Sequence, residues 1–537
     1  MVTPELARSL TEISVEIQRQ VGVLIDRRGH VARVVVGDAR SVFLPDLTAY
    51  RRGRDRLCGL RWVHTHLNGE PLSDDDLTDL ALLRFDLVAA VEAQPDGLPG
   101  QVFQAHLLPR NPDDRPWELL PPVSVHRLGD DFPQLISALE DEFQRTRREG
   151  REGGGGGDRA ILVHVSSDAR AVAEAGVAEL RELARSAGLS VVDVVIQRRD
   201  LHPKYVMGRG RLQETVIKAM QLGAELLIFD LNLTPSQVNA LATYTDLKVL
   251  DRTQVILDIF AQHAETREGR IQVELAQLRY LLPRLGAKQT ASALSRLTGG
   301  IGGRGPGETK LEIDRRRAQD RIAQLEREVK KLGERRRLRR ARRTRNALPV
   351  ISIVGYTNAG KSTLLNQLTR SEVTAENALF ATLNPVSRRL RFPREREVIV
   401  TDTVGFIRKL PEELMAAFRT TLEELDEADL LLHVVDASSP EVEQHIDTVR
   451  SVLKELHVSD KPTIMVLNKV DQCDGDTVAA LGARYQATPV CALQLDTLPP
   501  LLARIEAVLW PAQSDAAAQA IARNEADHVS PSEDAPA

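Results

Sequence analysis

Apolar and polar positions over residues 159–262 predict strands and helices in alternation. Apolar runs cover 160–165, 191–196, 225–229 and 247–250, and stretches with helical spacing lie between them near 170–187, 210–222 and 235–243. Strands that alternate with helices pair mostly in parallel, and the helices cover the sheet. This segment is therefore predicted to form an α/β domain with a small, mostly parallel sheet.

The same alternation returns nearer the C-terminus. Apolar runs at 350–354, 398–401 and 463–467 are each followed by a polar motif, and the first of them leads into a predicted helix at 362–368. We expect a second α/β domain here.

A different period governs residues 267–346. Apolar residues step by four and three on the first arm and recur every seven on the second, which is the pattern of coiled-coil seams. The two arms are therefore expected to pair as an antiparallel helical hairpin. The seam residues are Ile271, Leu275, Leu278, Leu282 and Leu285 on the first arm, and Leu311, Ala318, Ile322, Leu325, Val329 and Leu332 on the second.

The fold class predicted for the whole chain is α/β multidomain. A strand–turn–strand pattern at 21–25 and 31–36 indicates an extra N-terminal α/β module. The predicted domains are an N-terminal extension (1–150), a flexible Gly-rich linker (151–158), an α/β domain (159–266), a helical hairpin with a Gly-rich tip and a basic end (267–346), a nucleotide-binding domain (347–511) and a disordered tail (512–537).

Composition narrows the setting. The chain has 537 residues, 42% of them hydrophobic, and only three scattered cysteines, too few for a disulfide framework or a zinc cluster. No apolar run approaches the ~20 residues of a membrane span, and the N-terminus lacks a basic-then-apolar signal segment. We expect a monomer in the reducing cytoplasm.

Charge is distributed unevenly. The net charge is −5, yet residues 335–345 contain eight arginines in eleven positions, including Arg336, Arg340 and Arg343. Guanidinium groups suit phosphate, and so dense a block repels itself without a polyanion. We predict contact with nucleic acid; the competing interpretation is a solvated helix end.

Residues 355–362 form a complete G-x-x-x-x-G-K-S phosphate-binding loop between a predicted strand and a predicted helix. The glycines let backbone N–H groups face the phosphates, and the N-terminal helix dipole adds to anion binding. Lys361 is predicted to reach the β- and γ-phosphates, and the Ser362 hydroxyl to ligate Mg²⁺. A glycine-rich turn without a ligand is the weaker interpretation.

Further motifs in order along the chain point to guanine and magnesium. The Asp471 carboxylate of Asn-Lys-Val-Asp can accept two hydrogen bonds from guanine, a pair that adenine does not offer. Asp402 is predicted to hold Mg²⁺ through water, Thr382 to complete its shell, and the Gly405 N–H to sense the γ-phosphate. Lys361, Thr382 and Gly405 are the predicted catalytic groups. The predicted GTP-binding residues are Gly355, Tyr356, Thr357, Asn358, Ala359, Gly360, Lys361, Ser362, Thr363, Phe380, Ala381, Thr382, Leu383, Asn384, Asp402, Thr403, Val404, Gly405, Asn468, Lys469, Val470, Asp471, Cys491 and Ala492.

Two positions refine the chemistry. Phe406 stands where many small GTPases carry a glutamine that orients water, so slow intrinsic hydrolysis is expected, with the water organised by another group. Asn358 resembles an asparagine that related GTPases use beside K⁺. We expect faster turnover in K⁺ than in Na⁺.

The motif order over 347–510 resembles a translation-factor-class GTPase domain, which implies a P-loop fold with a mixed, mostly parallel sheet and helices on both faces. Together with residues 250–254 and the glycine-rich segment 299–309, it makes residues 159–510 resemble the HflX family. The resemblance implies a GTPase that binds the large ribosomal subunit and its rRNA and splits stalled ribosomes under stress. It also implies association with ribosomes or peripherally with membrane, and ATP hydrolysis in some members. The segments expected to contact ribosome or RNA are Gly299, Gly300, Gly302, Gly303, Arg304, Gly305 and the arginines named above. A GTP-switched, helicase-like protein acting on free rRNA is the alternative.

The extension carries a separate motif. Residues 63–76, with His64, His66, Ser73 and Asp76, resemble the His-x-His…Ser-x-x-Asp zinc motif of JAMM-type metallohydrolases. Two histidines and an aspartate can make a three-ligand zinc site with an open position. Leu67 replaces the usual proline, however, and the spacing to serine is one residue short. Three interpretations are open: an active zinc site, a degenerate relative of that fold, and an unrelated α/β module. The first would make the protein a zinc peptidase fused to a GTPase.

Overall fold

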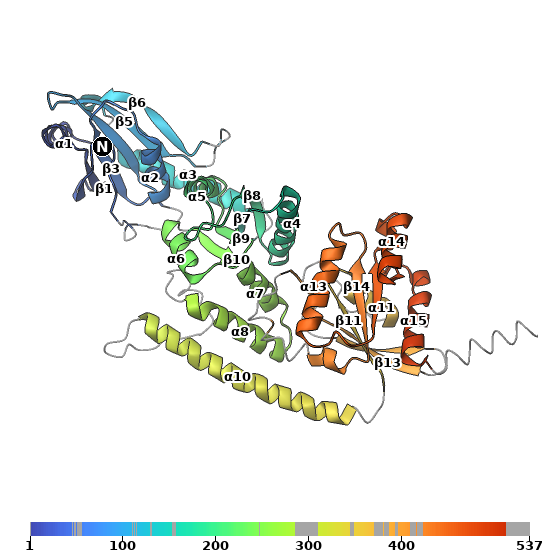
Figure 1. Ribbon diagram of the computed structural model, residues 1–537. Helices are drawn as coiled ribbons and strands as arrows, with labels where there is room; N and C mark the ends of the chain where they lie inside the picture. Colours follow the sequence, from blue (N-terminus) through green and yellow to red (C-terminus); the bar gives the residue numbers. More distant parts are fainter. Residues whose placement is uncertain are drawn as a thin grey trace, which may run out of the picture. The chain divides into compact units, whose positions relative to one another are not determined.

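The computed structural model comprises two compact units, residues 1–252 with 286–289, and residues 253–285 with 290–537 (Figure 1). The structure describes the chain except residues 1, 46, 48–49, 51–55, 110, 112, 114, 129–131, 153–156, 246, 285–309, 344–347, 370–379, 381–385, 393–395, 409–414, 416–422 and 512–537. In the described part, no helix is both long and apolar enough to cross a membrane.

The extension folds around a six-stranded mixed sheet of order β2-β1-β3-β4-β5-β6. The predicted strand–turn–strand is present as β1 and β2, which pair antiparallel. Within the sheet, β3 and β4 pair in parallel. The strands are β1 (Val21–Asp26), β2 (Val31–Val36), β3 (Leu60–His66), β4 (Leu87–Ala93), β5 (Pro99–Leu107) and β6 (Trp117–Ser124); the helices are α1 (Pro4–Ile17), α2 (Asp74–Leu83), η2 (Val125–Arg127) and α3 (Phe132–Glu152). The first two residues of the predicted linker, 151 and 152, are thus helical.

The second sheet of this unit has the predicted α/β alternation. Its four strands are all parallel, in the order β10-β9-β7-β8. The elements in chain order are β7 (Arg159–Ser166), α4 (Arg170–Ser186), β8 (Ser190–Arg198), α5 (Arg209–Gln221), β9 (Leu226–Phe229), α6 (Pro235–Tyr244) and β10 (Lys248–Asp251). Every strand and helix predicted between 160 and 250 is confirmed to within a few residues.

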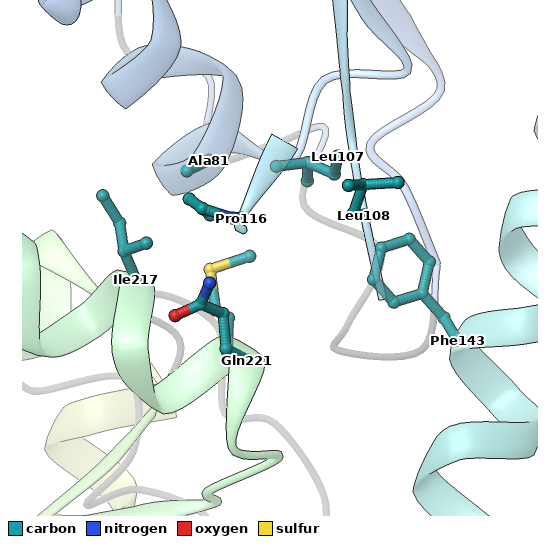
Figure 2. A pocket seen from close by; sticks show the side chains of 8 residues that line it. Ala81, Leu107, Leu108, Pro116, Phe143, Ile217 and Gln221 are labelled. Carbon is teal, nitrogen blue, oxygen red and sulfur yellow. The ribbon is translucent and has the colours of Figure 1, made fainter. Parts of the chain in front are cut away.

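Elements of the extension and of the parallel-sheet domain meet at a small, mostly apolar pocket (Figure 2). The extension provides one wall from α2, α3 and the loop after β5, and α5 provides the other. The lining residues are Ala81, Leu107, Leu108, Pro116, Phe143, Ile217, Met220 and Gln221. Ile217 and Met220 pack against the hydrophobic core of the extension, so the two sheets of this unit share buried apolar contacts.

The second unit contains the predicted helical pair. The helices are α7 (Arg252–His263), α8 (Arg267–Leu281), η3 (Leu282–Arg284) and α10 (Lys310–Arg343). α8 and α10 lie side by side, and a small core of Ile271, Leu275, Leu278, Ala318 and Leu325 joins them (Figure 1). Arg321 of α10 pairs with Glu274 of α8 at 2.7 Å beside that core. The pairing of these two seams follows the sequence pattern; Leu285 lies outside the described residues.

The remaining sheet is six-stranded, of order β12-β13-β11-β14-β15-β16, and all pairs except β12–β13 are parallel. Leu432 and Val434 of β14 pack with α11 and α15, whereas the next residue, Val435, packs with α13 and α14. Because successive strand residues face opposite sides, helices cover both faces. The elements are β11 (Val350–Gly355), α11 (Lys361–Thr369), β12 (Val386–Phe392), β13 (Arg396–Asp402), η5 (Glu423–Glu427), β14 (Leu430–Asp436), α13 (Val442–Glu455), β15 (Thr463–Asn468), η6 (Val470–Gln472), α14 (Gly475–Tyr485), β16 (Thr488–Pro489), η7 (Leu495–Thr497) and α15 (Pro499–Leu509).

Candidate functional site

The glycine-rich loop connects the central strand β11 to the N-terminus of α11, as predicted. Two of its residues have left-handed backbone, Asn358 at φ +61° and Gly360 at φ +90°. A Cβ at Gly360 would lie 2.2 Å from Nδ2 of Asn468, so only glycine fits against that side chain. The loop therefore directs backbone N–H groups and a helix N-terminus to one place, the arrangement that holds phosphate.

Lys361 is buried at the foot of this loop. Its side chain is 7% exposed, and Nζ donates to the Tyr356 carbonyl at 2.8 Å. Burial lowers the pKa of Lys361 to about 8, and the nearby Asp402 carboxylate offsets part of that shift. A buried ammonium with little water around it gains strongly from an anion, which suits contact with phosphate.

Ser362 and Asp402 bring two hard oxygen ligands together. The Ser362 hydroxyl, in the first turn of α11, donates to Asp402 Oδ2 at 2.6 Å, and Asp402 ends strand β13 with no exposed surface. A hydroxyl and a carboxylate beside a phosphate loop are the oxygen donors that Mg²⁺ takes in nucleotide sites. The donor set thus fits Mg²⁺.

The segment after Asp402 is attached to the phosphate loop by backbone hydrogen bonds. Thr357 N donates to the Phe406 carbonyl at 2.7 Å, and Phe406 N donates to the Gly355 carbonyl at 3.1 Å. A Cβ at Gly405 would lie 2.9 Å from Lys361 Nζ, so glycine lets this turn come close to the lysine. The Phe406 ring is 2% exposed and belongs to the interior.

The Asn-Lys-Val-Asp motif follows β15 and contacts both the phosphate loop and the residues after β16. Asn468 Nδ2 donates to the Ala359 carbonyl, and Asn468 Oδ1 accepts from Ala492 N, both at 2.9 Å. Burial, and then a hydrogen bond with the Asp471 carboxylate, raises the pKa of the Cys491 thiol. Asp471 itself is exposed and lies beside Cys491, as expected if both contact one base.

The sequence prediction did not include Asp436, the ion-pair partner of Lys469. Lys469 has left-handed backbone at φ +62°, and its Nζ pairs with Asp436 Oδ2 at 2.7 Å. Asp436 ends strand β14, the neighbour of β15, and a polar residue after an apolar run was the available signal. The carboxylate fixes the lysine of the base motif in position.

Some predicted residues cannot be placed. Phe380 is described: it is 3% exposed, its φ is +60°, and its ring lies 4.6 Å from that of Phe260. α10 spans positions 336, 340 and 343 of the arginine block. The predicted residues that lie outside the described part are Ala381, Thr382, Leu383 and Asn384 of the threonine loop, and Gly299, Gly300, Gly302, Gly303, Arg304 and Gly305 of the glycine-rich segment.

A phosphate loop on the central strand, an Asp-Thr-Val-Gly turn against it and an Asn-Lys-Val-Asp motif hydrogen-bonded to the loop through Asn468 define a P-loop GTPase. The chain matches three family models: GTP-binding GTPase N-terminal over residues 174–261, GTP-binding GTPase Middle Region over 263–343, and 50S ribosome-binding GTPase over 350–469. Together these matches cover more than half of the chain and leave out residues 1–173.

The curated relatives agree. The chain is 48% identical over 322 residues to "GTPase HflX" of Lacrimispora saccharolytica, which covers 60% of this chain and 76% of the relative. It is 44% identical over 319 residues to "GTPase HflX" of Escherichia coli (strain K12), covering 59% and 74%. Among solved structures, the complex of SsGBP with GDP matches 65% of this chain and 99% of that one at 26% identity, with a TM-score of 0.38. The chain belongs to the HflX GTPase family, and it hydrolyses GTP.

Proposed function

We propose that this GTPase binds the large ribosomal subunit and uses GTP binding and hydrolysis to split or remodel stalled ribosomes under stress, in the cytoplasm. The observation that carries the proposal is one unit combining a GTPase site with a long paired helix that ends in an arginine block. The model matched by residues 350–469 is described as a 50S ribosome-binding GTPase, which supports the same target.

The contacts of the phosphate loop and the base motif support the following proposed nucleotide roles. Lys361 holds the β- and γ-phosphates, Gly405 N–H faces the γ-phosphate, and Asp471 binds the guanine edge. Ser362 and Thr382 are the proposed Mg²⁺ ligands, with Asp402 acting through water. When bound, Mg²⁺ neutralises charge that develops on the transferred phosphoryl group.

Hydrolysis is proposed to depend on the partner. The buried Phe406 ring carries no hydrogen-bonding group, so the residue that follows Gly405 cannot orient the attacking water. Its backbone is also fixed by two hydrogen bonds to the phosphate loop, which keeps the ring away from solvent. In this proposal a group supplied by the partner organises the water, rather than a group elsewhere in the chain, and the free enzyme is slow.

The paired helices act as the proposed contact arm. The apolar seam between α8 and α10, with the Arg321–Glu274 pair beside it, stiffens the long helix. Arginines suit the phosphates of rRNA, and eight of them occur within residues 335–345. A stiff arm can transmit force to the ribosome when the GTPase site changes its nucleotide.

The second candidate function is a GTP-switched protein whose main target is free RNA. The arginine block supports it equally, because phosphate contacts do not distinguish naked rRNA from a folded subunit. What separates the two candidates is the source of stimulation: a subunit presents a fixed surface, whereas bare rRNA presents charge alone.

The test measures GTP hydrolysis by the purified chain alone, with purified large subunits, and with protein-free rRNA at matched phosphate concentration. Stimulation by intact subunits only supports the ribosome factor. Equal stimulation by bare rRNA supports the alternative, and stimulation by neither contradicts both. Lys361→Ala, which removes the phosphate-binding ammonium, serves as the inactive control.

Two variants test the arm. Arg336→Gln with Arg340→Gln and Arg343→Gln should weaken subunit binding and reduce its salt dependence, while basal GTP hydrolysis is unchanged. The matched control replaces three exposed basic residues elsewhere on α10, Arg315, Lys330 and Lys331, by glutamine. Deletion of 299–309 should spare GTP binding and abolish splitting of 70S particles in a sucrose gradient; splitting by the deletion protein would refute the role of the segment.

A further inference from the structure

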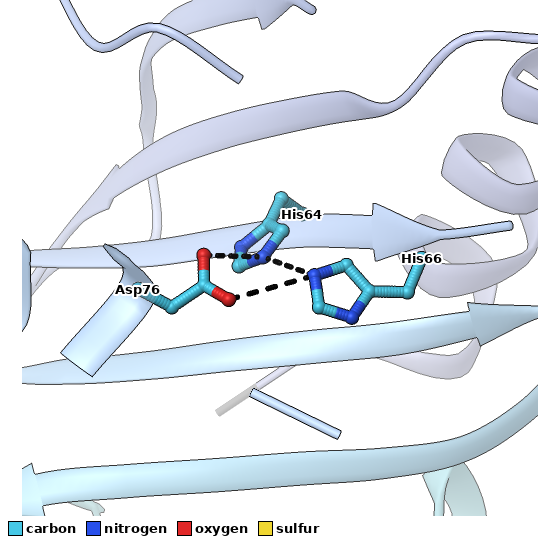
Figure 3. A group of neighbouring side chains, drawn as sticks. All are labelled: His64, His66 and Asp76. Atoms are coloured by element: carbon cyan, nitrogen blue, oxygen red, sulfur yellow. Dashed lines mark hydrogen bonds and ion pairs between the residues drawn. The ribbon is translucent and has the colours of Figure 1, made fainter. Parts of the chain in front are cut away.

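Three side chains of the extension converge on one point far from the GTPase motifs in sequence (Figure 3). His64 and His66 lie two apart on β3 and so face the same side of the sheet, and Asp76 lies in the first turn of α2. His64 Nε2 is 3.0 Å from His66 Nε2 and 3.1 Å from Asp76 Oδ1, and His66 Nε2 is 3.6 Å from Asp76 Oδ2. Both histidines are buried, at 1% and 6% exposure.

Each of two ligand groups is oriented by a neighbour. His66 Nδ1 lies 2.8 Å from the Glu70 carbonyl, which can only accept, so Nδ1 carries the proton and Nε2 keeps its lone pair. Asp76 Oδ2 accepts from Ser73 N at 2.8 Å and from Ser73 Oγ at 2.7 Å, within the capping box of α2. Oδ1 is thereby left to face His64. Outer contacts of this kind orient metal ligands.

The cluster holds more lone pairs than protons. His66 Nε2 and both oxygens of Asp76 are acceptors, and His64 Nε2–H is the one proton that can lie among them. Acceptors that face each other in a buried place repel unless a cation lies between them. A divalent ion removes this repulsion, and one hydrogen atom does so only in part.

Ring stacking, rather than a hydrogen bond at Nδ1, holds the His64 side chain in place. Its Nδ1 has no hydrogen-bond partner among the described residues, and its ring instead stacks on Trp62 at 5.2 Å between centroids and 16° between planes. Gly22 of β1 is the register partner of His64, and a Cβ there would lie 2.1 Å from Trp62 Cη2. Glycine on the neighbouring strand thus leaves the room that the stacked pair occupies.

We propose that His64 Nε2, His66 Nε2 and Asp76 Oδ1 bind a Zn²⁺ ion whose fourth position is open, with the proton of the neutral His64 ring then carried by Nδ1. Tetrahedral zinc with bonds of about 2.0–2.1 Å places its ligand atoms roughly 3.3 Å apart. His64 Nε2 lies 3.0 Å from His66 Nε2 and 3.1 Å from Asp76 Oδ1, close to that value, and the ligand atoms of the three residues all lie within 4.8 Å of one another. Two imidazoles and a carboxylate are ligands that zinc accepts, and three protein ligands with one open position are typical of catalytic rather than structural zinc. In sequence the site lies outside the three family models, the first of which begins at residue 174.

The sequence differs from the metallohydrolase motif in the spacing to Ser73 and at Leu67, and the structure shows what each difference does to the cluster. Although the spacing to serine is one residue short, Ser73 still caps α2 and brings Asp76 within reach of both histidines. Leu67, in place of proline, follows the end of β3 and is not part of the cluster. Neither difference in sequence removes a ligand atom from the site.

The test measures zinc per chain in the purified full-length protein, by mass spectrometry after incubation with equimolar Zn²⁺ and gel filtration, without a metal-binding tag. Wild type should hold about one ion, and His66→Gln and Asp76→Asn should lose at least about ten-fold in zinc affinity. Asp76→Asn keeps an oxygen that can accept from Ser73, so α2 remains capped. The matched control is His106→Gln on β5, a buried histidine of the same sheet outside the cluster.

Substitution by Co²⁺ gives a second readout, because a tetrahedral site produces intense visible absorption bands. Bands in wild type and in His106→Gln, and none in His66→Gln, support the site. Wild type that retains no zinc or cobalt would overturn the proposal in favour of a hydrogen-bonded triad, and so would undiminished zinc in both ligand variants. GTP hydrolysis should be equal in all four proteins, which separates this site from the GTPase function.

Discussion

Asn468 and Ala359 are joined by a hydrogen bond of 2.9 Å, from the side-chain Nδ2 of the first to the backbone carbonyl of the second, across 109 residues of chain. The same side chain accepts from Ala492 N through Oδ1. One buried amide therefore connects the phosphate loop, the base motif and the segment after β16. This group thus fixes the phosphate loop and the proposed base motif relative to each other.

Asn468→Ala should lower both stability and nucleotide affinity. The substitution leaves the Ala359 carbonyl and the Ala492 N–H without their partner, which costs about 2–3 kcal/mol of unfolding free energy. GDP affinity should fall on the order of ten-fold, because the loop loses its fixed geometry. Urea unfolding and fluorescent-GDP titration measure the two effects. Asn239→Ala, an exposed asparagine of α6, is the control; wild-type affinity in Asn468→Ala would contradict the bridging role.

Asp471→Asn should exchange guanine for xanthine. In its proposed role the carboxylate accepts from guanine N1–H and the 2-amino group, whereas an amide can donate to the second carbonyl of xanthine. The ratio of kcat/KM for GTP to that for XTP should fall on the order of 100-fold or more, since a site built for hydrogen bonds rejects a mismatched edge. Asp474→Asn, three residues on in the same segment, caps α14 and should leave the ratio unchanged. An unaltered preference in Asp471→Asn would place the base elsewhere.

Phe406→Gln should not create a faster enzyme, although it restores the residue common in small GTPases. The ring is 2% exposed and its backbone is bonded to Thr357 and Gly355, so a glutamine would point into the interior. Intrinsic hydrolysis should stay within a few-fold of wild type, and the unfolding free energy should fall by about 2–4 kcal/mol. Phe406→Leu, an apolar replacement, should cost less. Hydrolysis raised a hundred-fold in Phe406→Gln would show that the side chain can reach the phosphates.

Much of the fold can be predicted from the sequence, because the spacing of apolar residues and the motifs that end each element indicate the same elements. The strands between 160 and 250 were found from apolar runs, since strands buried on both faces are apolar throughout. The α8–α10 seam was found because paired helices need apolar residues at steps of three and four, which add up to a seven-residue repeat in the sequence. The phosphate loop was found because its residues are dictated by the ligand.

The missing parts depend on contacts between distant segments. Asp436 pairs with Lys469, yet nothing local distinguishes a strand-ending aspartate that fixes a lysine from one that faces water. The sequence predicted that Asn468 belongs to the guanine-binding motif. In the structure its side chain hydrogen-bonds the phosphate loop at Ala359 and the segment after β16 at Ala492. The motif at 63–76 offered His64, His66 and Asp76 as possible zinc ligands, but whether they meet depends on where α2 begins relative to β3, which the spacing does not encode.

Turnover should be faster in KCl than in NaCl at equal ionic strength. Asn358 is exposed at the edge of the phosphate loop with left-handed backbone, where its oxygen can help hold a monovalent cation beside the phosphates. Such a cation adds positive charge where negative charge develops, and the expected gain in kcat is roughly ten-fold. Asn358→Gly, which tolerates the same φ, should lose the difference between the two salts. Equal rates for the wild type in both salts would remove the hypothesis.

His433 should make the nucleotide-binding domain sensitive to acid. It lies in the middle of β14 between β11 and β15 with 2% exposure, and burial lowers its pKa to about 3, helped by the positive charges of Arg450 and Lys361. The unfolded chain binds a proton there near pH 6.5 and the folded chain does not until about pH 3, so stability falls as the pH drops between these values. At pH 5 the loss is about 2 kcal/mol.

His433→Leu removes the titrating group and should lose about 2 kcal/mol less than wild type between pH 7 and pH 5. Hydrogen exchange of amides in β14, followed by mass spectrometry during urea titration, reports the opening free energy of this domain separately from the rest of the chain. The control is His457→Asn, an exposed histidine at φ +58° where asparagine tolerates the left-handed backbone. It should keep the full acid sensitivity of wild type. Identical pH dependence in His433→Leu and wild type would mean that His433 is not the group responsible.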